Sequence, residues 1–217
     1  NFKKNDIISF NKLTNYGNWQ NASIKCYVDI ETINSSLYNL SFNKHNYIFM
    51  IGLGIVINNK WSFHVFTVNQ ITLTEETRIL NEFENKLNEL TMISSEKSEI
   101  PIFHWSNYEN SNLKPFININ EKFKFYDMCK WFMDDEICVK GAFDFKLKSI
   151  VSSLHKLKQT DICWSDSVCG GLDAMNQAYN YYTNNIGSKE QITNIEYYNQ
   201  IDCKSMWGIH NVFKNLI

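Results

Sequence analysis

The stretch Tyr27-Val28-Asp29-Ile30-Glu31-Thr32 places two carboxylates two residues apart inside a short apolar run. In a β-strand, residues i and i+2 point to the same face, so we expect Asp29 and Glu31 to stand side by side. The other face is apolar and is formed by Ile24, Cys26, Val28 and Ile30. Neighbouring carboxylates repel and raise each other's pKa unless a cation lies between them, and Mg²⁺ prefers carboxylate oxygens. A half-buried strand with one polar face in water also explains the stretch.

The composition indicates a chain that can build a hydrophobic core, and its net charge gives no general electrostatic attraction to nucleic acid. The chain has 217 residues, and 44% of them are hydrophobic, which suits one domain. A net charge of −2 means that binding to nucleic acid would need a local basic patch. The candidate patch consists of Lys140, Lys146, Lys148, Lys156 and Lys158. The solvated side of a helix explains these lysines equally well.

The cysteines and the apolar runs indicate the cellular compartment of the chain and whether it spans a membrane. No two of the six cysteines form a C-x-x-C pair, and the histidines do not cluster near them, which argues against a zinc site or an iron–sulfur cluster. Cysteines in apolar runs are typical of buried free thiols, so we expect an intracellular, reducing compartment, cytoplasm or nucleus. The sequence has no signal peptide and no run of 18 apolar residues, so no membrane span is expected in this segment.

Hydrophobic periodicity predicts an α/β fold. Residues 1–22 are expected to be an irregular lead-in, and residues 23–217 a single domain that is part of a longer chain. Strands are predicted over 24–31, 47–57, 61–68, 100–104 and 123–128. Helices are predicted after a capping box at Thr72 and Glu75, over 108–117 and 129–135, after a cap at Asp144, and over 173–182 and 192–216. Three antiparallel strands followed by βα units predict a mixed sheet flanked by helices.

The last predicted helix carries a further acid. With Tyr198 at zero on a helical wheel, most of its apolar residues fall in one arc of roughly 140°, and Asp202 lies inside that arc at about +40°. An ionised carboxylate in an apolar stripe costs several kcal/mol unless something compensates it. Tyr198 is four residues earlier and therefore lies one turn away on the same side. Asp202 is either a capped or ion-paired core residue or a functional acid.

A fourth acid, Glu109, ends the segment His104-Trp105-Ser106-Asn107-Tyr108-Glu109, which follows a predicted strand. Residues at this position in α/β folds often belong to a site. On this observation alone, a surface Glu at the start of a helix is the simpler explanation.

Together these segments resemble the DEDD, or DnaQ-like, 3′–5′ exonucleases of the RNase H-like superfamily. Asp29-Ile30-Glu31 matches the Asp-x-Glu of the first motif, and His104 to Glu109 matches the spacing of the second. Tyr198-Asn199-Gln200-Ile201-Asp202 matches the Tyr-x-x-x-Asp of the DEDDy subtype. The resemblance implies an RNase H-like mixed sheet of five strands, three antiparallel and then two parallel, flanked by helices.

The chain is most similar to the YprB-like branch, predicted exonuclease domains often found beside RecB-type nucleases or helicases. The shared features are Glu109, Leu147-Lys148, Gly170-Gly171 and the segment Tyr198 to Cys203. Two residues depart from the wider family, which usually has Asp in place of Glu109 and Asn in place of Trp105. Neither departure removes a carboxylate, so the resemblance still implies an enzyme.

The resemblance also implies roles for particular residues. Asp29 would bridge two divalent cations, Mg²⁺ or Mn²⁺, with Glu31 and Asp202 completing one site, Glu109 holding the other, and Tyr198 acting on the attacking water. Asp127 would be a supporting residue or simply a strand end. Nucleic-acid contacts are expected from His104, Trp105, Asn107, Phe143, Phe145, Lys146 and Lys148, by base stacking and phosphate binding.

The implied function is removal of 5′-nucleotides from the 3′ end of DNA or RNA, as in DNA repair, with helicase or other nuclease domains as possible neighbours in the full-length chain. Two alternatives remain open: a catalytically weak nucleic-acid-binding module with the same fold, and a structure-specific endonuclease with the same site.

Overall fold

The computed structural model describes residues 3–4, 7–13, 19–38, 40, 46–94, 99–116, 118, 120–165, 167–168, 170–184 and 187–216. Cys169 and Ile117, the last residue of the helix predicted over 108–117, lie outside the described residues. Every expected site residue lies within them.

The centre of the molecule is a five-stranded sheet in the order β5-β4-β3-β6-β7. Its strands are β3 (Ile24–Asn34), β4 (Asn46–Ile57), β5 (Lys60–Thr67), β6 (Ile100–His104) and β7 (Phe123–Asp127). The first three strands pair antiparallel, and β6 and β7 continue the sheet in parallel with β3. The predicted mixed sheet of three antiparallel and two parallel strands is therefore confirmed.

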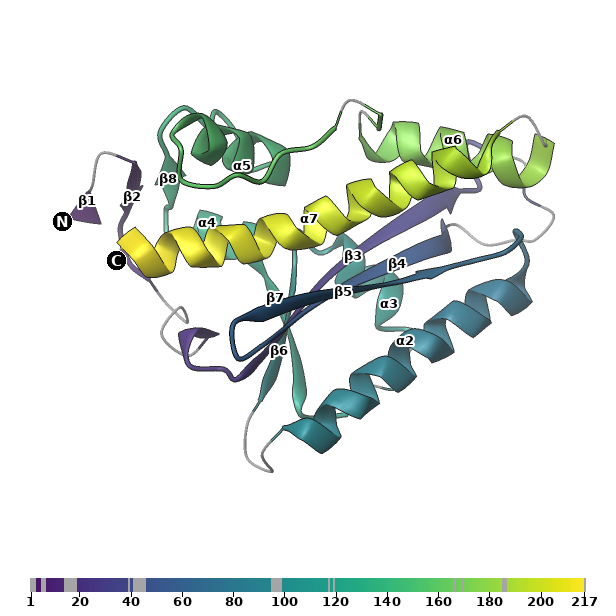
Figure 1. Ribbon diagram of the computed structural model, residues 1–217, viewed down its shortest axis with the longest axis horizontal. Helices are drawn as coiled ribbons and strands as arrows, with labels where there is room; N and C mark the ends of the chain where they lie inside the picture. Colours follow the sequence, from purple (N-terminus) through teal and green to yellow (C-terminus); the bar gives the residue numbers. More distant parts are fainter. Residues whose placement is uncertain are drawn as a thin grey trace.

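Two long helices, α2 (Leu73–Ile93) and α7 (Lys189–Leu216), cover opposite faces of this sheet (Figure 1). Side chains of β5 alternate between the two faces of the sheet, so Trp61 and Phe66 point to different helices. Trp61 stacks on Trp207 of α7 with ring centroids 5.2 Å apart, whereas Phe66 meets Phe83 of α2 at 6.0 Å. The shorter helices are α3 (Tyr108–Leu113), α4 (Met128–Asp134), α5 (Leu147–Lys156) and α6 (Gly171–Asn184).

The predicted helix starts lie close to the observed ones, but their capping interactions differ from those expected. Thr72 caps α2 by accepting a hydrogen bond from the Glu75 amide at 3.3 Å. The Glu75 carboxylate does not complete the capping box, because it accepts from the Asn69 amide instead. The expected cap at Asp144 is wrong by two residues: α5 begins at Leu147 after Lys146, and Asp144 accepts from the Lys146 amide just before the helix.

The segment expected to be an irregular lead-in contains structure. Strands β1 (Lys3–Lys4) and β2 (Ile8–Phe10) form a small antiparallel sheet with β8 (Cys138–Val139). Trp19 is buried, with its ring 5.2 Å from that of Phe103 and 5.0 Å from that of Trp131. Strands of two or three residues carry too little alternation to be recognised in a sequence, because pairing with β8 is what orders them.

The expectation of buried thiols holds for Cys26 and Cys203, whereas Cys138 and Cys163 are exposed. The five cysteines in the described part of the chain, Cys26, Cys129, Cys138, Cys163 and Cys203, are free thiols. Within the same residues, no helix combines the length and the apolarity that a bilayer crossing requires.

Candidate metal centre

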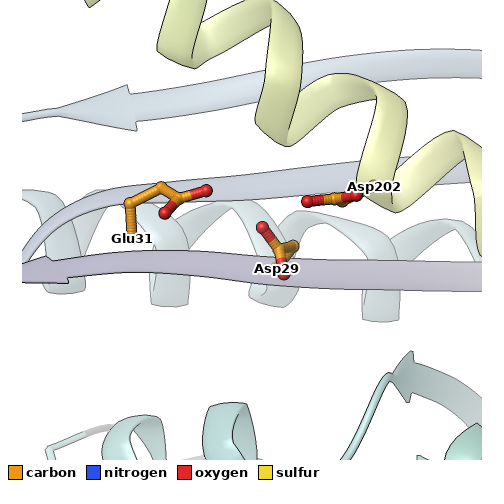
Figure 2. A group of neighbouring side chains, drawn as sticks. All are labelled: Asp29, Glu31 and Asp202. Atoms are coloured by element: carbon orange, nitrogen blue, oxygen red, sulfur yellow. The ribbon is translucent and has the colours of Figure 1, made fainter. Parts of the chain in front are cut away.

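Three carboxylates meet where β3 passes under α7. Asp29 and Glu31 come from β3 and Asp202 from α7, and Figure 2 shows their carboxylates turned toward one another. One oxygen of each group lies within 4.8 Å of the other two. Because side chains alternate along β3, Asp29 and Glu31 both lie on the face that α7 covers. The pairing of β3 with β4 has a β-bulge just after these acids, between Glu31 and Thr32. Bulges are common beside active sites because they redirect the side chains around them.

The carboxylates hold one another in an unfavourable electrostatic state. Burial raises the pKa of Asp29 well above its usual range, and the charges of Asp202, Glu31 and Glu109 raise it further. Burial and the charge of Asp202 do the same to Glu31. Burial raises the pKa of Asp202 to about 7, although hydrogen bonds from Trp164 and Tyr198 oppose the change. Without a cation, the cluster therefore retains protons close to neutral pH.

Glu109, the fourth expected acid, is buried at the start of α3. It is not one of the three groups within 4.8 Å of one another, but its charge raises the pKa of Asp29 and of Asp202. Its Oε2 lies 3.6 Å from Nδ1 of His104, beyond hydrogen-bond length, and has no hydrogen-bond partner among the described residues. A buried carboxylate oxygen without a partner is suited to a cation at this position.

Two neutral donors hold Asp202. The indole Nε1 of Trp164 donates to Oδ1 of Asp202 at 2.8 Å, and the Tyr198 hydroxyl also hydrogen-bonds the carboxylate. Lys148 lies over the Trp164 ring, with Nζ 5.8 Å from the ring centroid, and its charge opposes the rise in the pKa of Asp202. Trp164 comes from an irregular segment, and no pattern in the sequence indicates that it contacts Asp202.

Asn199 is a further contact that sequence reasoning missed. Its Nδ2 donates to Oδ2 of Asp29 at 2.7 Å, and the side chain is fully buried between α7 and the sheet. On the helical wheel Asn199 lies about 100° from Tyr198, just beyond the predicted apolar arc. A wider arc, drawn to include buried Cys203, would have found it.

Asp127 supports the segment that carries Glu109. Its Oδ1 accepts from the amide of Lys130, which caps α4, and from the amide of Ser106 at 3.1 Å. Ser106 has a φ of 80°, in the left-handed region, so the turn between β6 and α3 benefits from this added hydrogen bond. Asp127 therefore stabilises the turn that leads to Glu109.

A pocket of about 240 Å³ opens over the acids. Its lining residues are Asp29, Ile30, Glu31, Thr32, Tyr108, Gly171, Met175, Tyr198 and Asp202. The Tyr108 hydroxyl is held 2.6 Å from Oγ1 of Thr32 at its edge.

The residues expected to contact nucleic acid do not line this pocket and are placed in different ways. Phe143 is 100% exposed and Lys146 is exposed beside it. Trp105 Nε1 donates to the Phe145 carbonyl at 2.9 Å, which ties the segment before α5 to the end of β6. Asn107 is exposed at the start of α3. His104 is only 2% exposed, because its ring is packed beside Glu109.

The donor set fits a hard divalent cation. Carboxylate oxygens are the ligands that Mg²⁺ and Mn²⁺ prefer, and a cation would relieve the repulsion that raises the carboxylate pKa values. Asp29, Glu31 and Asp202 are the described residues that could hold such an ion together.

Comparison with known proteins identifies the family. A family model for the RNase H superfamily matches residues 26–213, and the chain belongs to this superfamily. Nucleases of this superfamily use divalent metals, so the family and the acid cluster indicate a hydrolase that acts on nucleic acid.

One solved structure with a similar fold is the family B DNA polymerase from the hyperthermophilic archaeon Pyrobaculum calidifontis. The TM-score is 0.52 at 11% identity, and the match covers 86% of this chain and 24% of the polymerase chain. At this identity, the likeness concerns the fold alone. No curated protein sequence matches the chain.

Proposed function

We propose that this chain is a metal-dependent 3′–5′ exonuclease that hydrolyses phosphodiester bonds of DNA or RNA. The observation that carries the proposal is the meeting of Asp29, Glu31 and Asp202 within 4.8 Å. Membership of the RNase H superfamily supports a nuclease. The resemblance of the acid motifs to the DEDDy subtype, and to the YprB-like branch, supports attack at a 3′ end.

The proposed roles follow from the position of each side chain. Asp29, Glu31 and Asp202 would hold one cation, and Asp29 with Glu109 a second. Two such cations supply stabilisation of the charge on the attacking and leaving oxygens of a phosphodiester. Tyr198, already hydrogen-bonded to Asp202, would orient the attacking water. The water oxygen would form a bond to phosphorus and release a proton to solvent, while the bond from phosphorus to the 3′ oxygen breaks and the 3′ oxygen takes up a proton.

The proposed substrate contacts come from residues outside the lining of the acid pocket. The exposed Phe143 and the half-buried Trp105 would stack on bases, and Asn107 would contact the strand near α3. Lys146 and Lys148 would contact backbone phosphates, with Lys148 already near the site through Trp164. For His104, which is buried beside Glu109, we propose support of that carboxylate instead of direct contact with the strand.

The test uses 5′-labelled and 3′-labelled single strands of DNA and RNA with Mn²⁺, Mg²⁺ or EDTA. The expected result is a ladder of 5′-labelled products that shorten from the 3′ end, abolished by EDTA and by Asp29→Ala. A melting curve of Asp29→Ala separates loss of chemistry from loss of fold. Metal-dependent cleavage that survives in a folded Asp29→Ala variant would contradict the assigned site.

Two other outcomes identify the alternatives. Internal cuts would favour a structure-specific endonuclease with the same acids. Retention of the strands on a filter without cleavage by either metal would favour a binding module. The raised pKa values and the unpaired Oε2 of Glu109 support a metal site over such a module, because an unused acid cluster only destabilises a fold.

A further inference from the structure

Asn199 makes a short hydrogen bond to Asp29 at the centre of the site. Its Nδ2 lies 2.7 Å from Oδ2 of Asp29, and the same side chain opposes the rise that burial causes in the pKa of Glu31. An ionised carboxylate only accepts hydrogen bonds, so the amide nitrogen with its two N–H groups is the atom that must face the two acids. One side chain from α7 therefore orients Asp29, the central acid of β3.

Burial of the Asn199 side chain costs free energy that its own hydrogen bonds do not offset. The side chain is 0% exposed, and among the described residues its Oδ1 finds no hydrogen-bond partner. An unpaired buried carbonyl destabilises the fold, so an apolar residue would serve a purely structural contact better. The compensation lies in what Nδ2 does for the carboxylates.

The sheet leaves a space for this amide at Gly52. Gly52 is the residue of β4 directly opposite Asp29, and residues directly opposite in an antiparallel pair share a face. A Cβ on Gly52 would lie 1.6 Å from Oδ1 and 2.8 Å from Cγ of Asn199. No side chain fits at position 52 while Asn199 keeps its place.

A neutral donor suits this position better than a cation. A lysine or arginine beside Asp29 would neutralise the carboxylate and compete with a metal ion for its oxygens. An amide fixes one oxygen by a hydrogen bond and leaves the negative charge in place. Partners that fix metal-binding groups in this way commonly change metal affinity 10- to 100-fold when they are removed.

We propose that Asn199 is a positioning residue that orients Asp29 for a divalent cation, and that Gly52 is the position that makes room for it. The proposal rests on the proposed function, since it takes the acid cluster to be a metal site. It assigns to Asn199 no contact with the substrate or the metal.

The first experiment measures Mn²⁺ binding directly, from the electron paramagnetic resonance signal of free Mn²⁺, with no substrate present. Asn199→Ala is expected to bind Mn²⁺ about 10- to 100-fold more weakly than the unchanged protein. Asn199→Leu, which keeps most of the volume, is expected to behave in the same way and covers the case in which the alanine variant does not fold. In cleavage assays, both variants are expected to need more Mn²⁺ and to recover most of their rate when Mn²⁺ is saturating.

The second experiment tests Gly52 by a double-mutant cycle. Gly52→Ala is expected to weaken Mn²⁺ binding as Asn199→Ala does, but to add little in the Asn199→Ala background, where the amide is gone. Gly54→Ala is the matched control on the same strand and face, because its Cβ would meet the Trp61 ring at 2.1 Å, away from Asn199. It is expected to lower thermal stability and to leave Mn²⁺ affinity unchanged.

The outcomes separate this proposal from the one on which it rests. Failure of the unchanged, folded protein to bind Mn²⁺ would overturn the metal site itself. Normal Mn²⁺ binding by the unchanged protein and by folded Asn199 variants would overturn the positioning role alone. Additive effects of Gly52→Ala and Asn199→Ala would remove Gly52 from the proposal.

Discussion

The acid cluster predicts that removing one of its charges stabilises the metal-free protein. Burial raises the pKa of Asp202 from 3.8 to about 7, so the folded state holds a proton there that the unfolded chain releases. Between these two values the folded state binds more protons, and the stability of the metal-free protein falls as pH rises. The full difference corresponds to on the order of 4 kcal/mol above about pH 7.

The perturbation is Asp202→Asn, which keeps the Oδ1 that accepts from Trp164 and replaces a charged oxygen by an N–H donor. Because the neutral amide has no buried charge to desolvate and no longer repels Asp29 and Glu31, we expect a gain of about 2–4 kcal/mol near pH 8 in EDTA. The gain should shrink to about 1–2 kcal/mol near pH 5 and vanish below about pH 4, where the unfolded chain is also protonated.

Urea unfolding with and without Mg²⁺ checks this prediction. Metal at about 100 times its dissociation constant should stabilise the unchanged protein by about 2.7 kcal/mol and should have far less effect on Asp202→Asn. Asp134→Asn is the control, since Asp134 forms an exposed ion pair with Lys130 and should change stability by less than about 0.5 kcal/mol. A folded Asp202→Asn protein that is less stable than the unchanged protein near pH 8 in EDTA would refute the reasoning.

Three further predictions follow from single contacts. Tyr198→Phe should lower the cleavage rate with little change in Mn²⁺ affinity, and an unchanged rate would remove the hydroxyl from the mechanism. Trp164→Phe removes a donor to Asp202, so Mn²⁺ titration should show affinity about 10-fold weaker, with equal affinity counting against the contact. Asp127→Ala removes the cap of α4 and the support of the Ser106 turn, and urea unfolding should show a loss of about 1–2 kcal/mol.

Much of the fold was readable because it depends on local periodicity. The strands of the main sheet and the cap at Thr72 follow from alternation and from side-chain chemistry within a few residues. The sheet of β1, β2 and β8 was not readable, because two-residue and three-residue strands are ordered by partners more than 100 residues away in the chain. The missing half of the capping box at Glu75 has a local cause, since the amide of Asn69, six residues earlier, donates to its carboxylate.

The sequence by itself determined that Asp29 and Glu31 share one face of a strand and that Asp202 lies on the apolar side of a helix, because backbone geometry sets both periods. Only the tertiary structure decided that these acids meet. It also decided that Asn199 contacts Asp29, which is 170 residues away in the sequence, in the space that Gly52 leaves free. A local pattern tells which side of an element is buried. Which buried groups touch depends on how distant elements pack. In this packing, the missing Cβ of Gly52 decides the contact of Asn199 as much as the charge of Asp29 does.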